Sequence, residues 1–524
     1  MTLQNIKYPI GIQSFRSIRK DGYVYVDKTK HIWQLVNSGK YYFLSRPRRF
    51  GKSLLLSTIE EYFKGNKELF EGLAISECEN DWIEYPVLHV DLNAQVYDSI
   101  EALQFTLTRQ LKDFANSLGV QMIDDGSVAD KLIELLKSVY HATGKQTAIL
   151  IDEYDKPLIA NIESVSLYND LQQTLKAFYG ALKSGDRYIK FAMLTGVARF
   201  SKVSVFSDLN NLNDISLNSE FSAICGITAS ELEKYFSSSI ERLAEVRHED
   251  VELTKQRLKE RYDGYHFSAP QYTEAIYNPF SLLTCFYGSR FRDLWFESGT
   301  SSLLIKPAIA KGFNVVNADD DIIAYESDLM SVNMPESSTI AVLYQTGYLT
   351  IKHYNERFER YTLGFPNAEV KRGFAQVAFL AYGNDNQTEF GIQNFIADLD
   401  DGKVESFIGR LQALMAKNPY EQAANAEATY HNLIFLLFTL LGYYADSESH
   451  MSHGRSDLVV KTRRHIYIFE FKLDETAETA LRQINERRYY APYQADGRKI
   501  VEIGINFSST ARNITDWLIE ERPE

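Results

Sequence analysis

Cysteine is scarce in this sequence, with only three in 524 residues. Cys78, Cys225 and Cys285 lie far apart along the chain. Such spacing supports neither a disulfide framework nor a cysteine-rich zinc cluster. It fits a protein of a reducing compartment, and we expect the cytoplasm.

Long apolar runs are also missing. The first residues lack the apolar core of a secretory signal peptide. The longest apolar run extends from Leu433 to Tyr444, includes Thr439 and Gly442, and is too short to cross a bilayer. The sequence therefore predicts no membrane partner.

Positive charge is in the minority, since the formal net charge is −14. This excess of acid argues against broad, non-specific coating of nucleic acid. It still allows a local basic cleft, because charges are screened over about 8 Å at physiological salt. The composition, 45% apolar and 24% charged, is that of an ordinary soluble globular protein. The length predicts roughly three or four domains.

The N-terminal half is organised around residues 41–56. A short apolar strand is predicted first, then a tight turn, then a helix that begins at Gly51-Lys52-Ser53. In a phosphate-binding loop of this order, backbone N–H groups and the positive end of the helix hold the phosphates. Lys52 would reach the outer phosphates, and the Ser53 hydroxyl would ligate Mg²⁺. An ordinary strand–helix turn is the alternative.

The loop departs from the usual pattern at its first position. The usual glycine is replaced by Arg46, and Arg48 and Arg49 follow within the turn. This loop therefore has less backbone freedom and more positive charge than the standard one. We include Arg48 and Arg49 among the candidate ATP-binding residues.

A second acidic motif follows one hundred residues after Lys52. The apolar run 148–151 ends in Asp152-Glu153, which predicts a buried parallel strand with carboxylates at its C-terminal tip. Asp152 would hold Mg²⁺ through water, and Glu153 would polarise the attacking water. Alone, such a run is often a strand end with solvated acids.

Two more segments complete the predicted nucleotide site. A strand over 188–197 carries Thr195 near its tip, where a polar residue would sense the γ-phosphate, and Arg199 just beyond could contact phosphate. A surface arginine is the alternative for Arg199. Residues 8–29 are a candidate base pocket or a surface lead-in. From 228 onward, helical patterning predicts a lid.

The C-terminal part carries a different chemistry. The sequence predicts two strands, the second over 465–473, in which Glu470 and Lys472 share one face. If the strands form a hairpin, Asp457 comes beside Glu470. The two carboxylates would then grip a divalent metal while Lys472 orients or deprotonates a water, which is the arrangement that phosphodiester hydrolysis needs. An exposed cross-strand pair is the alternative.

A locally basic surface is predicted around the same strands. Between residues 451 and 500 there are ten Lys and Arg against seven Asp and Glu. Phosphate contacts by such residues would make binding salt-sensitive. The candidates for nucleic-acid contacts are Arg455, Arg463, Arg464, Arg487 and Arg488, with solvated arginines as the alternative.

Several motifs together resemble the bacterial AAA-ATPase-like family, whose members are commonly fused to a C-terminal PD-(D/E)XK nuclease-like domain. The motifs are Tyr-Val-Asp-Lys-Thr (25–29), Arg-Pro-Arg-Arg-Phe-Gly-Lys-Ser (46–53), Ile-Asp-Glu-Tyr-Asp-Lys-Pro (151–157) and Tyr-Asn-Pro-Phe-Ser (277–281). The resemblance implies ATP and Mg²⁺ binding, with Mn²⁺ an alternative at the nuclease site. It also implies two further catalytic candidates, Glu427 as the first-helix acid and Gln483 on the helix after the catalytic strand.

The expected fold is α/β, in four parts. An AAA-like P-loop ATPase core over 1–227 precedes a helical lid over 228–312. A small winged-helix-like connector over 313–372 precedes a restriction-endonuclease-like domain over 373–524.

Two classes of function follow from these expectations. The first is an ATPase coupled to a metal-dependent nuclease that acts on DNA, with RNA left open, in mobile-element control or defence. The second is a nucleotide-gated module whose inactive nuclease-like domain only binds nucleic acid or a partner. A purely structural assembly protein is a third interpretation, and association with further copies of the chain is left open.

Overall fold

The computed structural model describes residues 6–294 apart from 94, 163 and 200–210, then 322–330, 339–416 apart from 384–387, a few positions between 433 and 440, and 457–522. The chain divides into two compact units. The first contains Met1–Trp295 and Asp320–Ala368, and the second contains Phe296–Asp319 and Glu369–Glu524.

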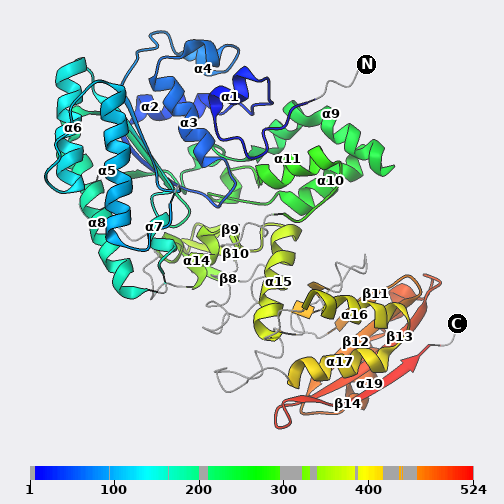
Figure 1. Ribbon diagram of the computed structural model, residues 1–524. Helices are drawn as coiled ribbons and strands as arrows, with labels where there is room; N and C mark the ends of the chain where they lie inside the picture. The colour runs from blue at the N-terminus through cyan, green and yellow to red at the C-terminus, as the bar shows by residue number, and fades with distance from the viewer. Residues whose placement is uncertain are drawn as a thin grey trace. The chain divides into compact units, whose positions relative to one another are not determined.

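A five-stranded parallel sheet forms the centre of the first unit (Figure 1). The strand order is β2-β3-β4-β1-β5, so β4 is inserted between the strand that precedes Gly51-Lys52-Ser53 and the strand that ends in Asp152. The strands are β1 (Tyr41–Ser45), β2 (Val87–Asp91), β3 (Thr147–Asp152), β4 (Ile189–Gly196) and β5 (Asn213–Asp214).

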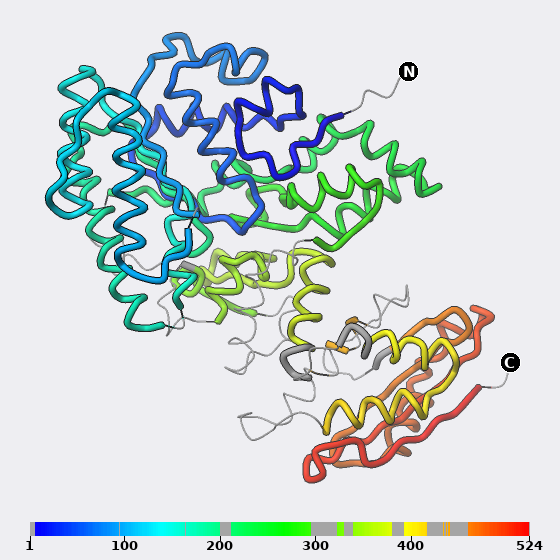
Figure 2. The backbone as a smooth tube through the Cα atoms, viewed as in Figure 1, coloured from blue at the N-terminus to red at the C-terminus, as the bar shows by residue number. Residues whose placement is uncertain are grey.

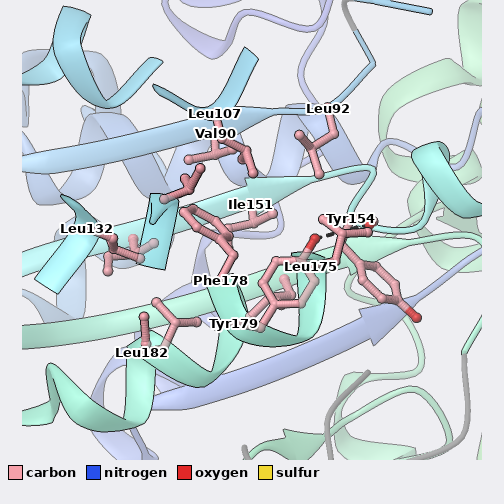
Figure 3. Close-up of a cluster of buried hydrophobic side chains, with 14 of the residues drawn as sticks. Val90, Leu92, Leu107, Leu132, Ile151, Tyr154, Leu175, Phe178, Tyr179 and Leu182 are labelled. Carbon is pink, nitrogen blue, oxygen red and sulfur yellow. Dashed lines mark hydrogen bonds between the residues drawn. The ribbon is translucent and has the colours of Figure 1, made fainter. Parts of the chain in front are cut away.

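Helices cover both faces of this sheet. On one face, α5, α6 and α8 pack apolar side chains against β2, β3 and β4 (Figure 3). Helix α3 lies on the other face, and the strand alternation turns Asp152 and Thr195 toward it. The helices of this part are α1 (Phe15–Lys20), α2 (Thr29–Ser38), α3 (Lys52–Phe63), α4 (Ile75–Cys78), α5 (Ile100–Ser117), α6 (Val128–Thr143), α7 (Lys156–Ile159) and α8 (Val165–Ser184).

The predicted lid is a helical cluster with its own core. Thr228 caps α9 through a capping box with Glu231. The N-terminal segment packs on this core through Tyr8, Ile10 and Val24. The elements are β6 (Ile227–Thr228), α9 (Ala229–Arg247), α10 (Val251–Tyr262), β7 (Ile276–Tyr277) and α11 (Pro279–Gly288).

The connector pairs short helices with a three-stranded antiparallel sheet of order β8-β10-β9. Around Gly347 a helix is followed directly by a strand. Its elements are β8 (Ile322–Tyr325), α13 (Glu326–Met330), α14 (Thr339–Gln345), β9 (Thr350–Asn355) and β10 (Arg360–Gly364). The expected boundary after residue 372 falls inside the next helix, α15 (Ala368–Gly383).

The second unit contains a four-stranded mixed sheet, of order β11-β12-β13-β14 (Figure 2). One sheet face packs on α17, where Phe407 lies 5.6 Å from the ring of Phe469. The other face carries α19. The elements are α16 (Thr388–Asp400), α17 (Val404–Ala416), β11 (Asp457–Lys461), β12 (His465–Leu473), α19 (Ala477–Arg487), β13 (Lys499–Ser508) and β14 (Asn513–Glu521).

The α/β fold class expected from the sequence is confirmed. Glu427, the expected first-helix acid, and Arg455 lie outside the described residues. No helix in the described part of the chain combines the length and the apolarity needed to cross a membrane.

Candidate nucleotide site and candidate nuclease site

The predicted phosphate-binding turn sits at the C-terminal end of β1. Gly51 has a φ of 95° at the N-cap of α3, a backbone conformation that favours glycine. Lys52 is buried, and its Nζ donates to the carbonyl oxygens of Arg46 (3.0 Å) and Pro47 (3.2 Å). The ammonium thus already points into the turn, where it would exchange these carbonyls for phosphate oxygens.

Arg46 does not add its charge to the surface of the turn. Its guanidinium is buried and donates to the carbonyl oxygens of Ser216 (2.9 Å) and Phe221 (3.2 Å). It also lies over the ring of Phe267, 4.1 Å from the centroid. Burial lowers the pKa of Arg46 to about 10. The arginine in place of the usual glycine therefore supports the turn from its buried side, through hydrogen bonds to backbone carbonyls and contact with the Phe267 ring.

The two other arginines of the turn differ in exposure. Arg49 is exposed, has a φ of 64°, and lies over the ring of Phe280 on α11, 3.8 Å from the centroid. Arg48 and Ser53 are half-buried. Arg49 therefore connects the turn to the lid, and phosphate contacts by Arg48 and Arg49 stay predictions.

A hydrogen bond between side chains connects the C-terminal ends of β3 and β4. Thr195 Oγ1 donates to Asp152 Oδ1 over 2.7 Å, and both side chains are buried. Glu153 follows with a φ of 53°, an uncommon conformation for a residue with a side chain. Strain of this kind is typical of functional sites. The three residues occupy the sheet edge where ligands of α/β folds bind.

Arg199 is engaged in protein contacts. Its Nε lies 2.5 Å from Asp214 Oδ2, and its backbone N–H donates to Gln345 Oε1 over 2.6 Å. Gln345 in turn donates to the Leu329 carbonyl. Contact between Arg199 and phosphate stays a prediction.

The sequence motifs predict no role for Asp155. Its carboxyl is fully buried, and Oδ2 accepts the backbone N–H groups of Val197 (2.9 Å) and Ala198 (2.6 Å). Burial, and then the charge of Glu153, raises the pKa of Asp155 to about 7. The signal available in the sequence was its place three residues after Asp152.

A cavity adjoins the turn at Gly51 and holds about 610 Å³ of space, part of it open to solvent. Its walls are mostly apolar and include Tyr25 and Lys28 from the segment expected to cover a base. The Lys28 ammonium is bound by Glu231 of α9 at 2.6 Å. An apolar pocket beside a phosphate-binding turn would suit a purine base.

The predicted hairpin of the C-terminal part is present. Strands β11 and β12 are antiparallel, and the backbone of Asp457 pairs with that of Glu470. Glu470 is fully buried, and Lys472 Nζ lies 3.3 Å from Glu470 Oε1. The same Nζ donates to Gln483 Oε1 on α19 over 2.7 Å. The structure therefore brings Glu470, Lys472 and Gln483 together.

Helix α19 is seated closely on the face that carries these residues. A Cβ added at Gly504 would lie only 2.5 Å from the Ala477 carbonyl oxygen, so glycine allows the helix to approach β13. Asp516 Oδ2 accepts the Ala477 N–H, and Thr476 caps the helix. These contacts fix the position of Gln483 relative to Lys472.

The predicted nucleic-acid arginines gather at the other end of the sheet. Arg463 and Arg464 form the exposed turn before β12, and Arg487 and Arg488 are exposed at the end of α19. Arg464 precedes Glu470 by six residues, which is ~20 Å along a strand. A nucleic acid that touches all four would have to extend that far from Glu470.

Both sites offer oxygen ligands of the kind that hard divalent cations prefer. Ser53 and Asp152 would hold Mg²⁺ beside Lys52, where it would neutralise charge on the phosphates. Glu470, with Asp457, would hold a metal that stabilises charge on a phosphodiester. Within the described residues, no three His, Cys, Asp or Glu side chains cluster as a ready-made metal site.

Comparison with known proteins finds a family match for the N-terminal part of the chain and another for the C-terminal part. A family model described as a predicted AAA-ATPase matches residues 9–206. A protein of Azotobacter chroococcum mcd 1, described as an uncharacterized protein in the vnfD 5′ region, is 34% identical over 526 residues, covering 98% of this chain and 99% of that protein. The chain belongs to the AAA-ATPase-like family. The model of the PD-(D/E)XK nuclease superfamily matches residues 425–517, the second domain of this AAA-ATPase-like protein.

Among solved structures, this AAA-ATPase-like chain resembles two proteins of Aeropyrum pernix. ORC2 in ADPNP and ADP complexes is 11% identical with a TM-score of 0.25, over 72% of this chain and 96% of that one. ORC1 in complex with DNA is 11% identical with a TM-score of 0.23, over 67% and 91%. These distant likenesses carry no argument about the site.

Proposed function

We propose that this chain hydrolyses ATP with Mg²⁺ and uses the nucleotide state to control a metal-dependent nuclease that cleaves DNA. The cytoplasm is its place of action, and its setting is the control of mobile elements or defence against foreign DNA. Each half of the proposal has its own support, and a series of contacts leads from the phosphate-binding turn to the end of the first unit.

ATP hydrolysis is supported by the sheet edge. Lys52 at the start of α3, Asp152 at the end of β3 and Thr195 near the end of β4 lie at this edge. Phosphoryl transfer asks a protein mainly for positioning and charge neutralisation, and a lysine, a hydroxyl and a carboxylate supply both. Glu153 stands next to Asp152 to orient the attacking water.

The nuclease is carried by one observation, the placement of Lys472. Its ammonium lies between Glu470 and Gln483, and the backbone of Asp457 pairs with that of Glu470. A lysine beside a carboxylate-bound metal can orient or deprotonate a water. Gln483 fixes the lysine, so that the side chain is oriented before substrate arrives.

The coupling is supported by contacts that connect the turn to the end of the first unit. Phe50, next to Gly51, packs its ring 4.8 Å from Tyr265. One residue on, the His266 N–H donates to Thr350 Oγ1 of the connector. Asn367 donates to the Asp263 carbonyl, directly before α15 begins at Ala368. A shift of the turn on ATP binding would reach this last contact.

The rival function, a module that only binds nucleic acid, is favoured by the burial of Glu470. Its side chain has an exposed fraction of 0% and is within ion-pair distance of Lys472. A carboxylate held in this way serves stability as well as catalysis. Under this alternative, Lys472→Ala would change nothing catalytic.

The test is incubation of the full chain with labelled DNA and RNA, with and without Mg²⁺ or Mn²⁺ and ATP. Lys472→Ala should lower cleavage by about 10²–10⁴-fold while nucleic-acid binding persists. The matched control is Lys499→Ala, a partly exposed lysine of the same sheet paired with Glu521. Full cleavage by Lys472→Ala would remove the catalytic assignment.

A further inference from the structure

The segment 152–155 and the segment 195–198 are bound to each other more tightly than neighbouring strands require. Five hydrogen bonds join them: Thr195 Oγ1 to Asp152 Oδ1, the Tyr154 N–H to the Thr195 carbonyl, the Tyr154 hydroxyl to the Ala198 carbonyl, and the Val197 and Ala198 N–H groups to Asp155 Oδ2. Two of the five use one carboxylate oxygen of Asp155.

We propose that Asp155 is a positioning residue for ATP hydrolysis, holding the tip of β4 so that Thr195, Asp152 and Glu153 keep their reactive geometry. The inference rests on the proposed ATPase function and names a further residue of that site. Asp155 touches neither nucleotide nor metal in this role and acts only through the backbone of β4.

The need for an acceptor at this place follows from the backbone. Beyond Gly196 the chain leaves the sheet, so the N–H groups of Val197 and Ala198 have lost their ladder partners. A buried N–H without an acceptor costs as much as a lost hydrogen bond, and here two successive donors point the same way. One carboxylate oxygen accepts both, which fixes the path of the chain just after Thr195.

Close packing makes this anchor rigid. A Cβ added at Gly196 would lie 2.6 Å from the Tyr154 ring and 2.7 Å from Asp155 Oδ1. The segments 152–155 and 195–198 are therefore packed with no space for a further atom. Tyr154 is itself held by the Tyr179 hydroxyl, which donates to its carbonyl over 3.1 Å (Figure 3). A change at Asp155 is therefore transmitted to Thr195.

The anchor also explains how Glu153 keeps its unusual backbone. Glu153, with its φ of 53°, is flanked by two residues held in place by hydrogen bonds. Asp152 accepts the Thr195 hydroxyl, and Tyr154 is held through its N–H, its carbonyl and its hydroxyl. A sparsely populated conformation persists only where the surroundings over-determine it. Release of the β4 tip would let Glu153 relax and lose its aim at the attacking water.

The experiment compares the wild-type full chain with Asp155→Asn and Asp155→Ala in steady-state Mg·ATP hydrolysis and in equilibrium binding of a fluorescent ATP analogue. Asp155→Asn keeps an oxygen that accepts both N–H groups and should keep most of kcat. Asp155→Ala should lower kcat at least about tenfold with little change in nucleotide Kd. The control is Tyr42→Phe, which removes a buried hydroxyl bonded to the Leu35 carbonyl away from this edge.

Different outcomes test the positioning role of Asp155 and the proposed ATPase activity. Wild-type kcat in folded Asp155→Ala, or equal loss of kcat in Asp155→Asn and Asp155→Ala, would overturn the positioning role. If Asp155→Ala does not fold, Tyr154→Phe decides, because it removes the second side-chain anchor of Ala198 and should lower kcat in the same direction. Unchanged kcat in Tyr154→Phe would then overturn it. Failure of the wild type to hydrolyse ATP would instead overturn the proposed ATPase.

Discussion

Arg46 and Asp155 show how single buried charges shape the nucleotide site. Both side chains are almost fully buried, and both bind backbone groups of segments that form the sheet edge. A buried charge is tolerated only where such hydrogen bonds replace water. The turn and the β4 tip are therefore positioned by side chains that lie beneath the proposed phosphate site.

Removal of Arg46 should destabilise the first unit. Arg46→Ala would leave the Ser216 and Phe221 carbonyls without their donor and open a cavity beside Phe267. We expect the free energy of unfolding to fall by about 3 kcal/mol or more. Thermal unfolding should show this, against the exposed Arg109→Ala as control. Equal melting temperatures for the two variants would refute the bracing role.

Asp155 should give stability a specific pH dependence. Its pKa is raised to about 7, first by burial, so the folded state binds this proton more tightly than the unfolded state does. The stabilisation is therefore complete below about pH 4 and is lost as the pH rises through 7. Relative to that of Asp155→Asn, the free energy of unfolding of the wild type should fall by up to about 4 kcal/mol between pH 4 and 7.5. Urea unfolding curves whose difference does not change with pH would contradict this.

Helix α19 is the element on which the nuclease site depends. It presents Gln483 to Lys472 only because Gly504 lets its backbone approach β13. The helix carries no metal ligand of its own. Its contribution is to hold the lysine in place, which a small displacement would undo.

Gly504→Ala should therefore abolish cleavage while ATP hydrolysis persists. The added Cβ would lie 2.5 Å from the Ala477 carbonyl oxygen and 2.8 Å from the Leu481 nitrogen, so the helix must move. The cost is about 1–3 kcal/mol of stability in the second unit. Gly409→Ala on α17 meets nothing within 4 Å and should be neutral in both assays. Normal cleavage by Gly504→Ala would remove α19 from the account.

Periodicity and motif order sufficed to predict the elements that carry these sites. The α3 turn, the β3 tip and the β11–β12 hairpin follow from local patterns of apolar and acidic residues. The role of Arg46 could not be predicted, because its acceptors at Ser216 and Phe221 lie about 170 residues away. Nor could the tie between Arg199 and Gln345, which only the packing of the connector creates. Long-range partners of polar groups leave no local pattern.

The molecule as a whole is proposed to act as a switch with its two sites in different units. The contacts of Tyr265, His266 and Asp263 extend from the turn to Asn367, the residue before α15. Energetic coupling between two sites requires an element that has two arrangements, with ligand binding at either site shifting the equilibrium between them. We propose that the segment 262–267, seated on residues 366–367, is that element.

Gly264→Ala should uncouple the two activities. Gly264 has a φ of 94°, and an added Cβ would lie 2.0 Å from the Pro366 carbonyl oxygen. ATP hydrolysis should continue, whereas the response of cleavage to ATP should disappear. Gly288→Ala on α11 meets only an ordinary contact at 3.7 Å and is the control. An unchanged ATP response in Gly264→Ala would place the coupling elsewhere.

The most direct measurement is the rate of DNA cleavage at fixed Mg²⁺ with and without ATP, in the wild type, Lys52→Ala and Lys472→Ala. Lys64→Ala, a half-exposed lysine just after α3, is the control for Lys52. The wild type and Lys64→Ala should respond to ATP, Lys52→Ala should cleave at a rate that ATP does not change, and Lys472→Ala should cleave about 10²–10⁴-fold more slowly than the wild type. Cleavage at the wild-type rate in Lys472→Ala, or cleavage that responds to ATP in Lys52→Ala, would contradict the account.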